Sequence, residues 1–425
     1  MRFIWSWYLS GAGCSWAILA SKCHSVLWQM QASKVIFLKS YEKLNSIMKR
    51  RKILFVVTED WYFCSHRLPL AVAAKKASYD VIVATRITNH QENIERNGIR
   101  TINLRYMKRS SLNILRELTA FFELLLLFRK EKPDLVHMVA LKPVIYGSLA
   151  AQLLGVSCKV NALGGLGFIF SSKWALARFL RPIILTVFRF IFNDHQSRLI
   201  LQNENDWSLV TNKAGVDRKN VRLIRSAGVN LDDYVQTELP DGTPIVILAS
   251  RMLWDKGIDE FATAANLLRE QGISARFVLV GEPDIENPSS VPREQLHKWN
   301  DGGVIEWWAY RKNMPEVFSQ ASIVCLPSYY GEGVPKVLIE AMACARPIVT
   351  TDMPGCRDVI REEKNGILIK PKNAADLAGA LELLLNNPSL CQKMGREGRL
   401  IAEKDYSLTK VIKETLNVYQ ELLSQ

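Results

Sequence analysis

The sequence predicts an α/β protein made of two doubly wound parallel sheets. From Met48 onward, short apolar runs alternate with helical stretches, and the same alternation begins again after a polar segment at residues 226–243. A repeating strand and helix order is typical of parallel sheets that carry helices on both faces. We therefore expect two Rossmann-like halves of comparable size, joined by that polar segment.

In the first half, the expected strands are short runs of apolar and β-branched residues bounded by charged or turn residues. They cover residues 53–57, 81–85, 135–138, 159–162 and 199–202. The expected helices between them cover residues 68–76, 112–129, 144–154 and 174–192.

The second half repeats the pattern. Its expected strands cover residues 245–249, 276–280, 304–307, 323–326, 347–350 and 366–369, and its helices cover 258–271, 314–320, 337–344, 374–386, 389–403 and 408–423. We expect residues 48–230 to form an N-terminal domain and residues 231–405 a C-terminal domain. The last helix, within 406–425, either continues the second domain or packs back on the first.

Residues 1–47 differ from the rest of the chain. Residues 3–21 contain no charge, but tryptophan, serine and glycine interrupt the apolar stretch, so it is a poor match to a membrane span of about 20 apolar residues. Three interpretations remain open: an extension outside the fold, a membrane anchor, or a cleaved signal peptide. We favour the extension because Met48 and a basic lead-in directly precede the first buried strand.

The basic excess lies in the first half of the chain. The formal net charge is +13, and residues 48–240 hold 29 basic and 16 acidic side chains, whereas residues 241–425 hold 21 and 25. A positive field favours an anionic partner, which leaves nucleic acid, an acidic membrane surface and phosphorylated small molecules as candidates.

Several common phosphate and metal motifs are missing from the sequence. There is no G-x-G-x-x-G after the first strand, no G-x-x-x-x-G-K-[ST], no Asp-x-Asp pair and no Cys-x-x-Cys pair. The sequence therefore argues against a nicotinamide-dependent dehydrogenase and a P-loop NTPase, and we expect no metal ion and no other cofactor.

The most informative segment is PSYYGEGVPKVLIEAMACARPIVTTDMP, residues 327–354. It follows a buried strand and enters a helix through glycines, so the Gly333 and Val334 amides would be free to bind phosphate at a helix start. Glu332 lies on the loop and Glu340 about two turns into the helix, separated by seven residues. A helical glutamate at that depth suits a ribose diol, although two glutamates at one spacing are common by chance.

The residues around these glutamates resemble the signature of the family 4 glycosyltransferases. Further stretches that resemble this family occur along the chain, from KILFVVTED to ASRMLWDKG. The resemblance implies a GT-B fold, with two Rossmann-like domains facing a central cleft, and sugar transfer with retention and without a metal. It also assigns roles. Arg251 and Lys256 would hold the donor diphosphate, Glu340 the nucleotide ribose, and Glu332 the transferred sugar.

On the acceptor side, the resemblance points to the glycine-rich loop that contains Gly164 and Gly165. His66 follows the first strand and His137 ends the third, so both are candidates for a group in the cleft, with His137 as a catalytic candidate; a packed histidine is an equally good interpretation of each. Lys142 is either a ligand of an acceptor phosphate or a solvated side chain.

The helix at residues 173–192 is aromatic and basic, with a kink or break expected at Pro182. On a continuous helix, Arg178, Arg181 and Arg189 share one arc. This pattern suits the surface of an acidic membrane, and a domain helix with its arginines in water explains it equally well.

The subgroup of this family that the sequence most resembles builds bacterial envelope glycans, and the resemblance implies a hexosyltransferase or N-acetylhexosaminyltransferase. The donor would be a nucleotide diphosphate sugar, with UDP favoured, and the acceptor a polyprenyl-diphosphate-linked glycan of O-antigen or capsule synthesis at the cytoplasmic face of the membrane. A UDP-sugar 2-epimerase of similar architecture and a non-enzymatic nucleic-acid binder are the alternatives. We expect no nucleic-acid partner, because the diphosphate and glutamate motifs are intact.

Overall fold

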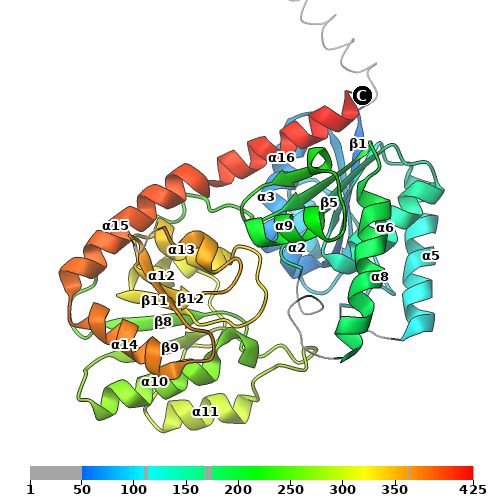
Figure 1. Ribbon diagram of the computed structural model, residues 1–425. Helices are drawn as coiled ribbons and strands as arrows, with labels where there is room; N and C mark the ends of the chain where they lie inside the picture. Colours follow the sequence, from blue (N-terminus) through cyan, green and yellow to red (C-terminus); the bar gives the residue numbers. More distant parts are fainter. Residues whose placement is uncertain (1–49, 110–112, 167–169, 171–174, 362–363, 425) are drawn as a thin grey trace, which may run out of the picture. The chain divides into compact units, whose positions relative to one another are not determined.

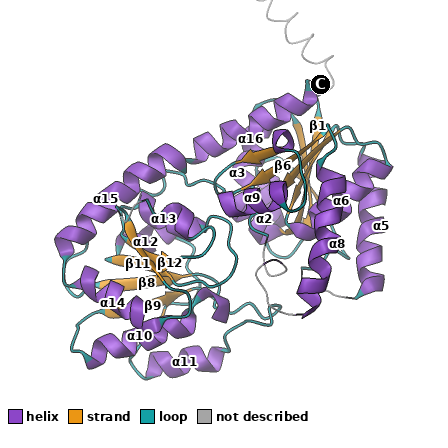
Figure 2. Ribbon diagram, viewed as in Figure 1, coloured by secondary structure: helices purple, strands orange, loops and turns teal. Residues whose placement is uncertain are grey.

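The computed structural model describes residues 50–109, 113–166, 170, 175–361 and 364–424 (Figure 1). Its contacts place Arg51–Gln425 in one compact unit. The predicted N-terminal extension, residues 1–47, lies outside the described residues. Within the unit, two parallel sheets confirm the predicted fold class (Figure 2).

The first sheet has seven parallel strands in the order β3-β2-β1-β4-β5-β6-β7. The strands are β1 (Lys52–Glu59), β2 (Asp80–Arg86), β3 (Arg100–Asn103), β4 (Leu135–Val139), β5 (Cys158–Ala162), β6 (Ser197–Leu201) and β7 (Val221–Leu223). This order is that of a doubly wound nucleotide-binding sheet, in which ligands bind beyond the carboxyl ends of the strands.

Helices cover both faces of the first sheet. One face packs against α5 (Ile114–Glu131), α6 (Leu141–Leu153), α8 (Ala175–Phe192) and α9 (Glu204–Asn212), and the other against α3 (Leu68–Lys76) and the C-terminal helix α16 (Leu408–Leu423) (Figure 1). Alternate strand residues supply the two cores: Leu54 and Val56 lie in the first, Ile53 and Phe55 in the second. Short helices α2 (Asp60–His66) and α4 (Gln91–Arg96) follow β1 and β2.

The second sheet repeats the strand order of the first, as β10-β9-β8-β11-β12-β13. Its strands are β8 (Ile245–Ala249), β9 (Arg276–Val280), β10 (Glu306–Trp307), β11 (Ile323–Leu326), β12 (Ile348–Thr351) and β13 (Gly366–Ile369). The surrounding helices are α10 (Ile258–Glu270), α11 (Arg293–Asp301), α12 (Met314–Ser319), α13 (Lys336–Ala343), α14 (Ala374–Leu385) and α15 (Pro388–Asp405).

The chain passes between the two halves twice, once through the predicted linker and once just before the last helix. Val229, in the predicted linker, forms a bridge to Ser407, which directly precedes α16. The last helix then returns to the first sheet: it contacts α3 and β5, and the Cys158 thiol lies 3.4 Å from the carbonyl oxygen of Leu422.

The helix α8 is continuous through Pro182, so the expected break does not occur. Thr186 donates its hydroxyl to the Pro182 carbonyl at 2.9 Å, within the same turn. Among the described residues, no helix combines the length and the apolar composition needed to cross a bilayer.

Candidate active site

The loops after β8 and β11 bring Lys256 and Glu332 into direct contact. Their side chains form an ion pair and are 14% and 15% exposed. The Ser328 hydroxyl donates to the same carboxylate oxygen, Oε1 of Glu332, at 3.0 Å. The structure thus unites one residue of the predicted diphosphate pair with the residue predicted to contact the sugar.

Glu340 lies on α13, which begins directly after Pro335. Its carboxylate accepts a hydrogen bond from the Tyr234 hydroxyl at 2.7 Å. It also forms an ion pair with Lys336, one turn earlier on the helix, at 2.9 Å. Burial, and then the negative charge of Glu340, raise the pKa of Tyr234. Glu340 is buried, and both groups contact its Oε1, which fixes the orientation of a carboxylate that could accept hydrogen bonds from a diol.

The two glycine loops pack backbone against backbone. Gly165 has a φ of +123°, and a β-carbon there would lie 2.6 Å from the Gly333 amide nitrogen. A β-carbon on Gly333 would lie 2.2 Å from the Gly164 carbonyl oxygen. The Val334 amide, which the sequence led us to expect free for phosphate, instead donates to Oε1 of Gln202 at 3.0 Å, across the same junction. The acceptor-side loop and the donor-side loop therefore fit together only because both carry glycine.

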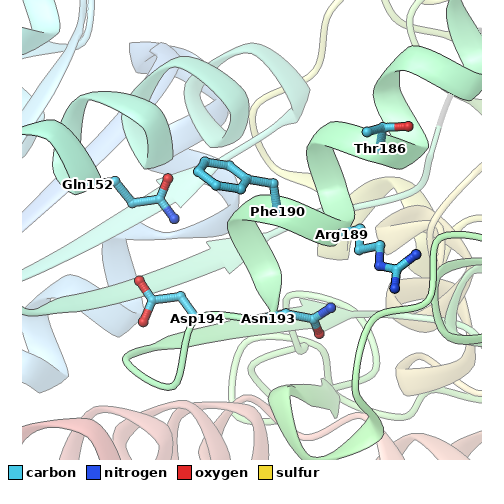
Figure 3. A pocket seen from close by; sticks show the side chains of 6 residues that line it. All are labelled: Gln152, Thr186, Arg189, Phe190, Asn193 and Asp194. Carbon is cyan, nitrogen blue, oxygen red and sulfur yellow. The ribbon is translucent and has the colours of Figure 1, made fainter.

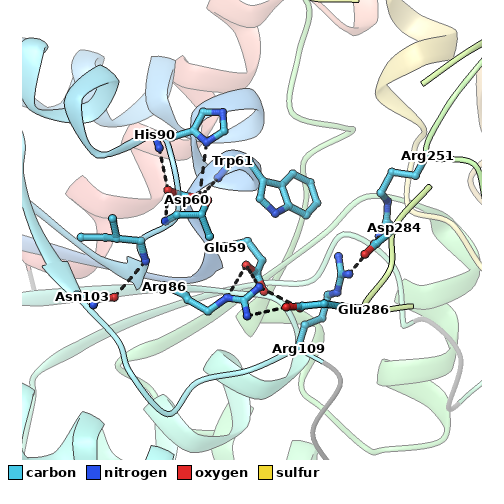
Figure 4. A network of polar contacts seen from close by, with 12 residues as sticks. Glu59, Asp60, Trp61, Arg86, His90, Asn103, Arg109, Arg251, Asp284 and Glu286 are labelled. Carbon is cyan, nitrogen blue, oxygen red and sulfur yellow. Dashed lines mark hydrogen bonds and ion pairs between the residues drawn. The ribbon is translucent and has the colours of Figure 1, made fainter. Parts of the chain in front are cut away.

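Arg251, the other predicted diphosphate ligand, follows β8 and pairs with Asp284. Its Nη1 lies 2.6 Å from Oδ2 of Asp284, and Nη2 of Arg109 lies 2.6 Å from the same oxygen. Both guanidinium groups lie 5.8 Å from the centroid of the Trp61 ring (Figure 4), within the range of cation–π attraction. Partial burial alone would raise the pKa of Asp284, but the two arginines outweigh it and lower that pKa.

The buried carboxylate of Asp60 organises the backbone next to Trp61. Asp60 accepts hydrogen bonds from the amides of Trp61 at 2.7 Å and His90 at 3.0 Å (Figure 4). It also accepts from the Thr88 amide at 2.7 Å and the Thr88 hydroxyl at 2.6 Å. Burial alone would raise the pKa of Asp60, but these hydrogen bonds lower it. The ionised carboxylate thereby ties the loops after β1 and β2 together.

His66 lies among the cations of this region. Burial lowers its pKa to about 3, and the positive charges of Lys336, Arg67 and Arg251 contribute. Its ring stacks on Tyr62, with centroids 4.2 Å apart, and Nδ1 lies 2.5 Å from the Ser65 hydroxyl oxygen. At neutral pH His66 is an uncharged hydrogen-bonding group.

His137 is not part of the site. It is fully buried in β4, on the sheet face covered by α16, where it stacks on Phe55 with centroids 5.0 Å apart. Its Nδ1 lies 2.5 Å from the Tyr419 hydroxyl. A histidine within the strand points into the core rather than past the strand end, so the structure replaces the expectation of a catalytic group with the packing interpretation.

Lys142, at the start of α6, is engaged by α5. Its ammonium group lies 2.7 Å from Glu117 and 3.0 Å from the Lys108 carbonyl oxygen. Glu117 also accepts a hydrogen bond from Tyr146 at 2.8 Å. Burial, and then this carboxylate, raise the pKa of Tyr146. Lys142 therefore ties α6 to α5, and a role toward an acceptor phosphate would require it to leave these partners.

A cavity of about 540 Å³ lies elsewhere, where α6 and α8 end (Figure 3). It is lined by Gln152, Thr186, Arg189, Phe190, Asn193 and Asp194. These residues precede β5 and β6, so the cavity lies at the amino ends of the strands rather than near Lys256 and Glu332. Among the described residues, no group of three or more His, Cys, Asp or Glu side chains is arranged to hold a metal ion.

The sequence did not single out Trp61, Arg109, Gln202 or Asp284. Trp61, Gln202 and Asp284 all lie just beyond the carboxyl end of a parallel strand, namely β1, β6 and β9. That position alone marks them, since loops at this edge form the ligand sites of doubly wound sheets. No sequence pattern marks Arg109.

Two family models match the chain. The model described as "Glycosyl transferase 4-like" matches residues 52–203, and the model described as "Glycosyl transferases group 1" matches residues 232–401. The chain is 30% identical over 338 residues to an N,N'-diacetylbacillosaminyl-diphospho-undecaprenol α-1,3-N-acetylgalactosaminyltransferase of Campylobacter jejuni, covering 76% of this chain and 86% of that protein. It is 20% identical over 326 residues to a UDP-Gal:α-D-GlcNAc-diphosphoundecaprenol α-1,3-galactosyltransferase of Escherichia coli, covering 74% and 82%.

The same architecture occurs in solved structures. HepE of Anabaena, determined in complex with UDP, superimposes with a TM-score of 0.69 at 16% identity, covering 87% of this chain and all of that one. The two parallel sheets and this likeness show that the fold is GT-B. The chain belongs to the group 1 glycosyltransferases, with a glycosyltransferase 4-like N-terminal half, which confirms the family indicated by the sequence.

Proposed function

We propose that the protein transfers a hexose or N-acetylhexosamine, with retention, from a nucleotide diphosphate sugar to a hydroxyl of a polyprenyl-diphosphate-linked glycan. We favour UDP as the nucleotide and O-antigen or capsule synthesis as the setting. The observation that carries the proposal is the direct contact of Lys256 with Glu332, beside the start of α13. This contact supports the proposal because it brings a cation that would bind the diphosphate next to a carboxylate that would contact the sugar.

Donor binding follows from the groups around α13. Lys256 and Arg251 would bind the diphosphate oxygens, while Glu340, fixed by Tyr234 and Lys336, would accept hydrogen bonds from the ribose. The Gly333 amide belongs to the same loop. Cations and amides that are already oriented stabilise charge as it develops on the leaving diphosphate, which is the largest contribution a site of this kind makes to the rate.

In the reaction, the acceptor hydroxyl oxygen forms a bond to the anomeric carbon while the bond from that carbon to the donor phosphate oxygen breaks. The electron pair leaves with the nucleoside diphosphate, and the hydroxyl proton is released. Glu332 would contact the transferred sugar, and neutral His66 would offer a hydrogen bond without adding charge. No metal ion is included in the proposal.

The proposed acceptor is supported by the names of two related proteins and by the positive charge of the first half of this chain. The Campylobacter and Escherichia relatives are named for undecaprenyl-diphosphate-linked acceptors. The basic first half of this chain suits an anionic lipid partner. On α8, Arg178 and Arg189 are exposed beside three exposed apolar side chains, whereas Arg181 is partly buried. The apolar side chains are Phe179 (68% exposed), Ile183 (49%) and Phe190 (66%).

A second apolar stripe lies on α5, which contacts α6 as α8 does. Its exposed members are Ile114, Leu115, Leu118, Phe122 and Leu126, between 49% and 76% exposed. Exposed apolar side chains next to arginines suit the interface of an acidic bilayer. We therefore propose peripheral contact with the membrane through α5 and α8.

The test is a donor screen with radiolabelled UDP-sugars and lipid-linked acceptor extracted from a bacterium that makes such glycans. We expect label in the lipid fraction with one donor, and an α-linkage in the product from an α-linked donor by NMR. Donor turnover without acceptor, giving an epimer, would instead establish the epimerase alternative. A β-linked product would contradict retention.

A further inference from the structure

The Asp284 carboxylate is shared by arginines from the two halves of the unit. Arg251 lies just after β8 of the second sheet, whereas Arg109 lies between β3 and α5 of the first half. Both donate to Oδ2 of Asp284 at 2.6 Å, and both lie 5.8 Å from the centroid of the Trp61 ring (Figure 4). One carboxylate oxygen thus links the expected diphosphate ligand to a cation of the acceptor side.

The same loop is held by a second ion pair. Glu286, two residues after Asp284, accepts two hydrogen bonds from Arg86 at 2.9 Å each, and Nε of Arg86 donates to Glu59 at 3.0 Å (Figure 4). Hydrogen bonds from Arg86 lower the pKa of Glu286, whereas burial raises that of Glu59. The loop after β9 is therefore attached to the first half of the unit at two points, Arg86 in β2 and Arg109 after β3.

The charges of this cluster balance. It holds three guanidinium groups and three carboxylates: Arg86, Arg109 and Arg251 with Glu59, Asp284 and Glu286. A diphosphate that binds Arg251 adds negative charge beside Asp284, so the two anions compete for one cation. Asp284 is 15% exposed, and a nearly buried carboxylate that loses its cation is costly unless another takes over. Arg109 is already in place to do so.

We infer, on the basis of the proposed function, that Arg109 is a positioning residue for the donor. It retains the Asp284 carboxylate when the diphosphate engages Arg251, and so makes Arg251 available to the diphosphate. Arg109 acts through Asp284 and not by contact with the phosphate. Donor binding would then strengthen the ion pair between Arg109 and Asp284, which joins the acceptor side to the donor side.

A double-mutant cycle tests this inference, with the dissociation constant measured by calorimetry for UDP and, separately, for inorganic pyrophosphate. In Arg109→Met, Asp284 has only Arg251 as a partner, and we expect both ligands to bind about tenfold more weakly. In the Asp284→Asn background the competing charge is gone, so Arg109→Met should then change the affinity less than twofold. Arg109→Lys keeps a cation for Asp284 and should stay within about threefold of the unsubstituted protein.

Arg105→Met is the matched control, because it removes an arginine from the same segment and should leave both dissociation constants unchanged. Thermal unfolding of each variant checks that it is folded. An equal loss of affinity from Arg109→Met in both backgrounds would mean direct phosphate contact and would overturn the inference, as would no loss in either. If pyrophosphate follows the expected cycle but UDP does not bind, the inference stands and the proposed nucleotide is wrong.

Discussion

Gly165 and Gly333 lie so close together that a β-carbon on Gly165 would come within 2.6 Å of the Gly333 amide nitrogen and 2.9 Å of the Glu332 carbonyl carbon. The first glycine follows β5 of one sheet, and the second precedes α13 beside the other. Because the neighbouring atoms are backbone, they cannot swing aside as a flexible side chain would. The position of Glu332 therefore depends on a residue without a side chain on the opposite loop.

Gly165→Ala should impair both stability and transfer. A β-carbon at φ +123° is strained, and the contact with Gly333 must also be relieved by moving one loop. We expect a loss of about 2–4 kcal/mol in the free energy of unfolding and at least a tenfold loss in kcat/KM, measured by urea unfolding and by sugar transfer.

Gly155→Ala separates the effect of backbone strain from the effect of contact between the loops. Gly155 has a φ of +66°, but nothing lies within 4 Å of a β-carbon placed there. This variant should lose only about 1 kcal/mol, from backbone strain, and keep its transfer rate. Equal losses of stability in the two variants would show that contact between the loops is unimportant.

Lys256→Ala should abolish most transfer while the protein stays folded. The substitution removes a cation expected at the leaving diphosphate and leaves the Glu332 carboxylate with the Ser328 hydroxyl as its remaining hydrogen-bond partner in the site. We expect a loss of about 10²–10³ in kcat, the size seen when one stabilising group is removed from a developing anion.

The control for Lys256 is Lys298→Ala, an exposed lysine on α11 of the same half. It should retain full activity, with unchanged thermal unfolding. Transfer by Lys256→Ala within threefold of the unsubstituted protein would remove Lys256 from the proposed site.

The sequence predicted the central strands well, and three of the four edge strands of the described sheets poorly; the fourth, β13, matches the expected residues 366–369. Central strands are buried on both faces and appear as continuous apolar runs, such as Ile245–Ala249 in β8. The two edge strands of the first sheet, β3 and β7, were not predicted, because their sequences RTIN and VRL are short and contain polar residues, which interrupt an apolar run. At the edge of the second sheet, the four residues expected at 304–307 reduce to two in β10.

The residues of the candidate site likewise fall into those that the sequence could indicate and those that it could not. The pattern around Glu332, Gly333 and Glu340 is local in the sequence, so it could be recognised there. The pairing of Asp284 with Arg109 joins residues 175 positions apart, and nothing in either neighbourhood indicates the other. The burial of His137 likewise depends on Tyr419, which reaches it from the last helix.

His137→Ala should therefore reduce stability and leave catalysis intact. It removes a fully buried ring from between Phe55 and Tyr419, and we expect a loss of about 2–4 kcal/mol in the free energy of unfolding. Tyr419→Phe should cost about 1–2 kcal/mol, because it removes the hydroxyl that contacts Nδ1. Transfer is measured at a temperature at which both variants are folded, and a loss of kcat beyond tenfold in His137→Ala would restore a catalytic role.

Asp206 should make stability depend on pH. Burial raises its pKa to about 6, against 3.8 ordinarily, although Asn203 and the Leu166 amide donate to its carboxylate. Because the folded-state pKa is the higher one, the contribution of Asp206 to stability is fully present below pH 3.8 and is lost as the pH rises through 6.

Asp206→Asn keeps an oxygen for both hydrogen bonds but carries no charge. It should be more stable than the unsubstituted protein by about 1–3 kcal/mol at pH 8, with the difference shrinking toward zero at pH 4, in urea unfolding across that range. Asp241→Asn, at an exposed position, should show no such trend. A difference that grows as the pH falls would contradict the sign of the effect.

The apolar stripes of α5 and α8 give a prediction about membranes. Phe122 and Leu118 on α5 are 56% and 49% exposed, and Phe179 on α8 is 68% exposed. If these side chains enter a bilayer, Leu118→Ser with Phe122→Ser should weaken sedimentation with vesicles of anionic lipid about tenfold or more, at an unchanged thermal unfolding temperature.

Charge and apolar burial can then be separated. Arg178→Glu with Arg189→Glu should weaken binding to anionic vesicles strongly in low salt and less in high salt, because surface charges are screened. Leu400→Ser, an exposed leucine on α15 of the second half, should bind as the unsubstituted protein does. If the protein sediments equally with neutral and anionic vesicles, or if the α5 and α8 variants bind like Leu400→Ser, these helices are not the membrane surface.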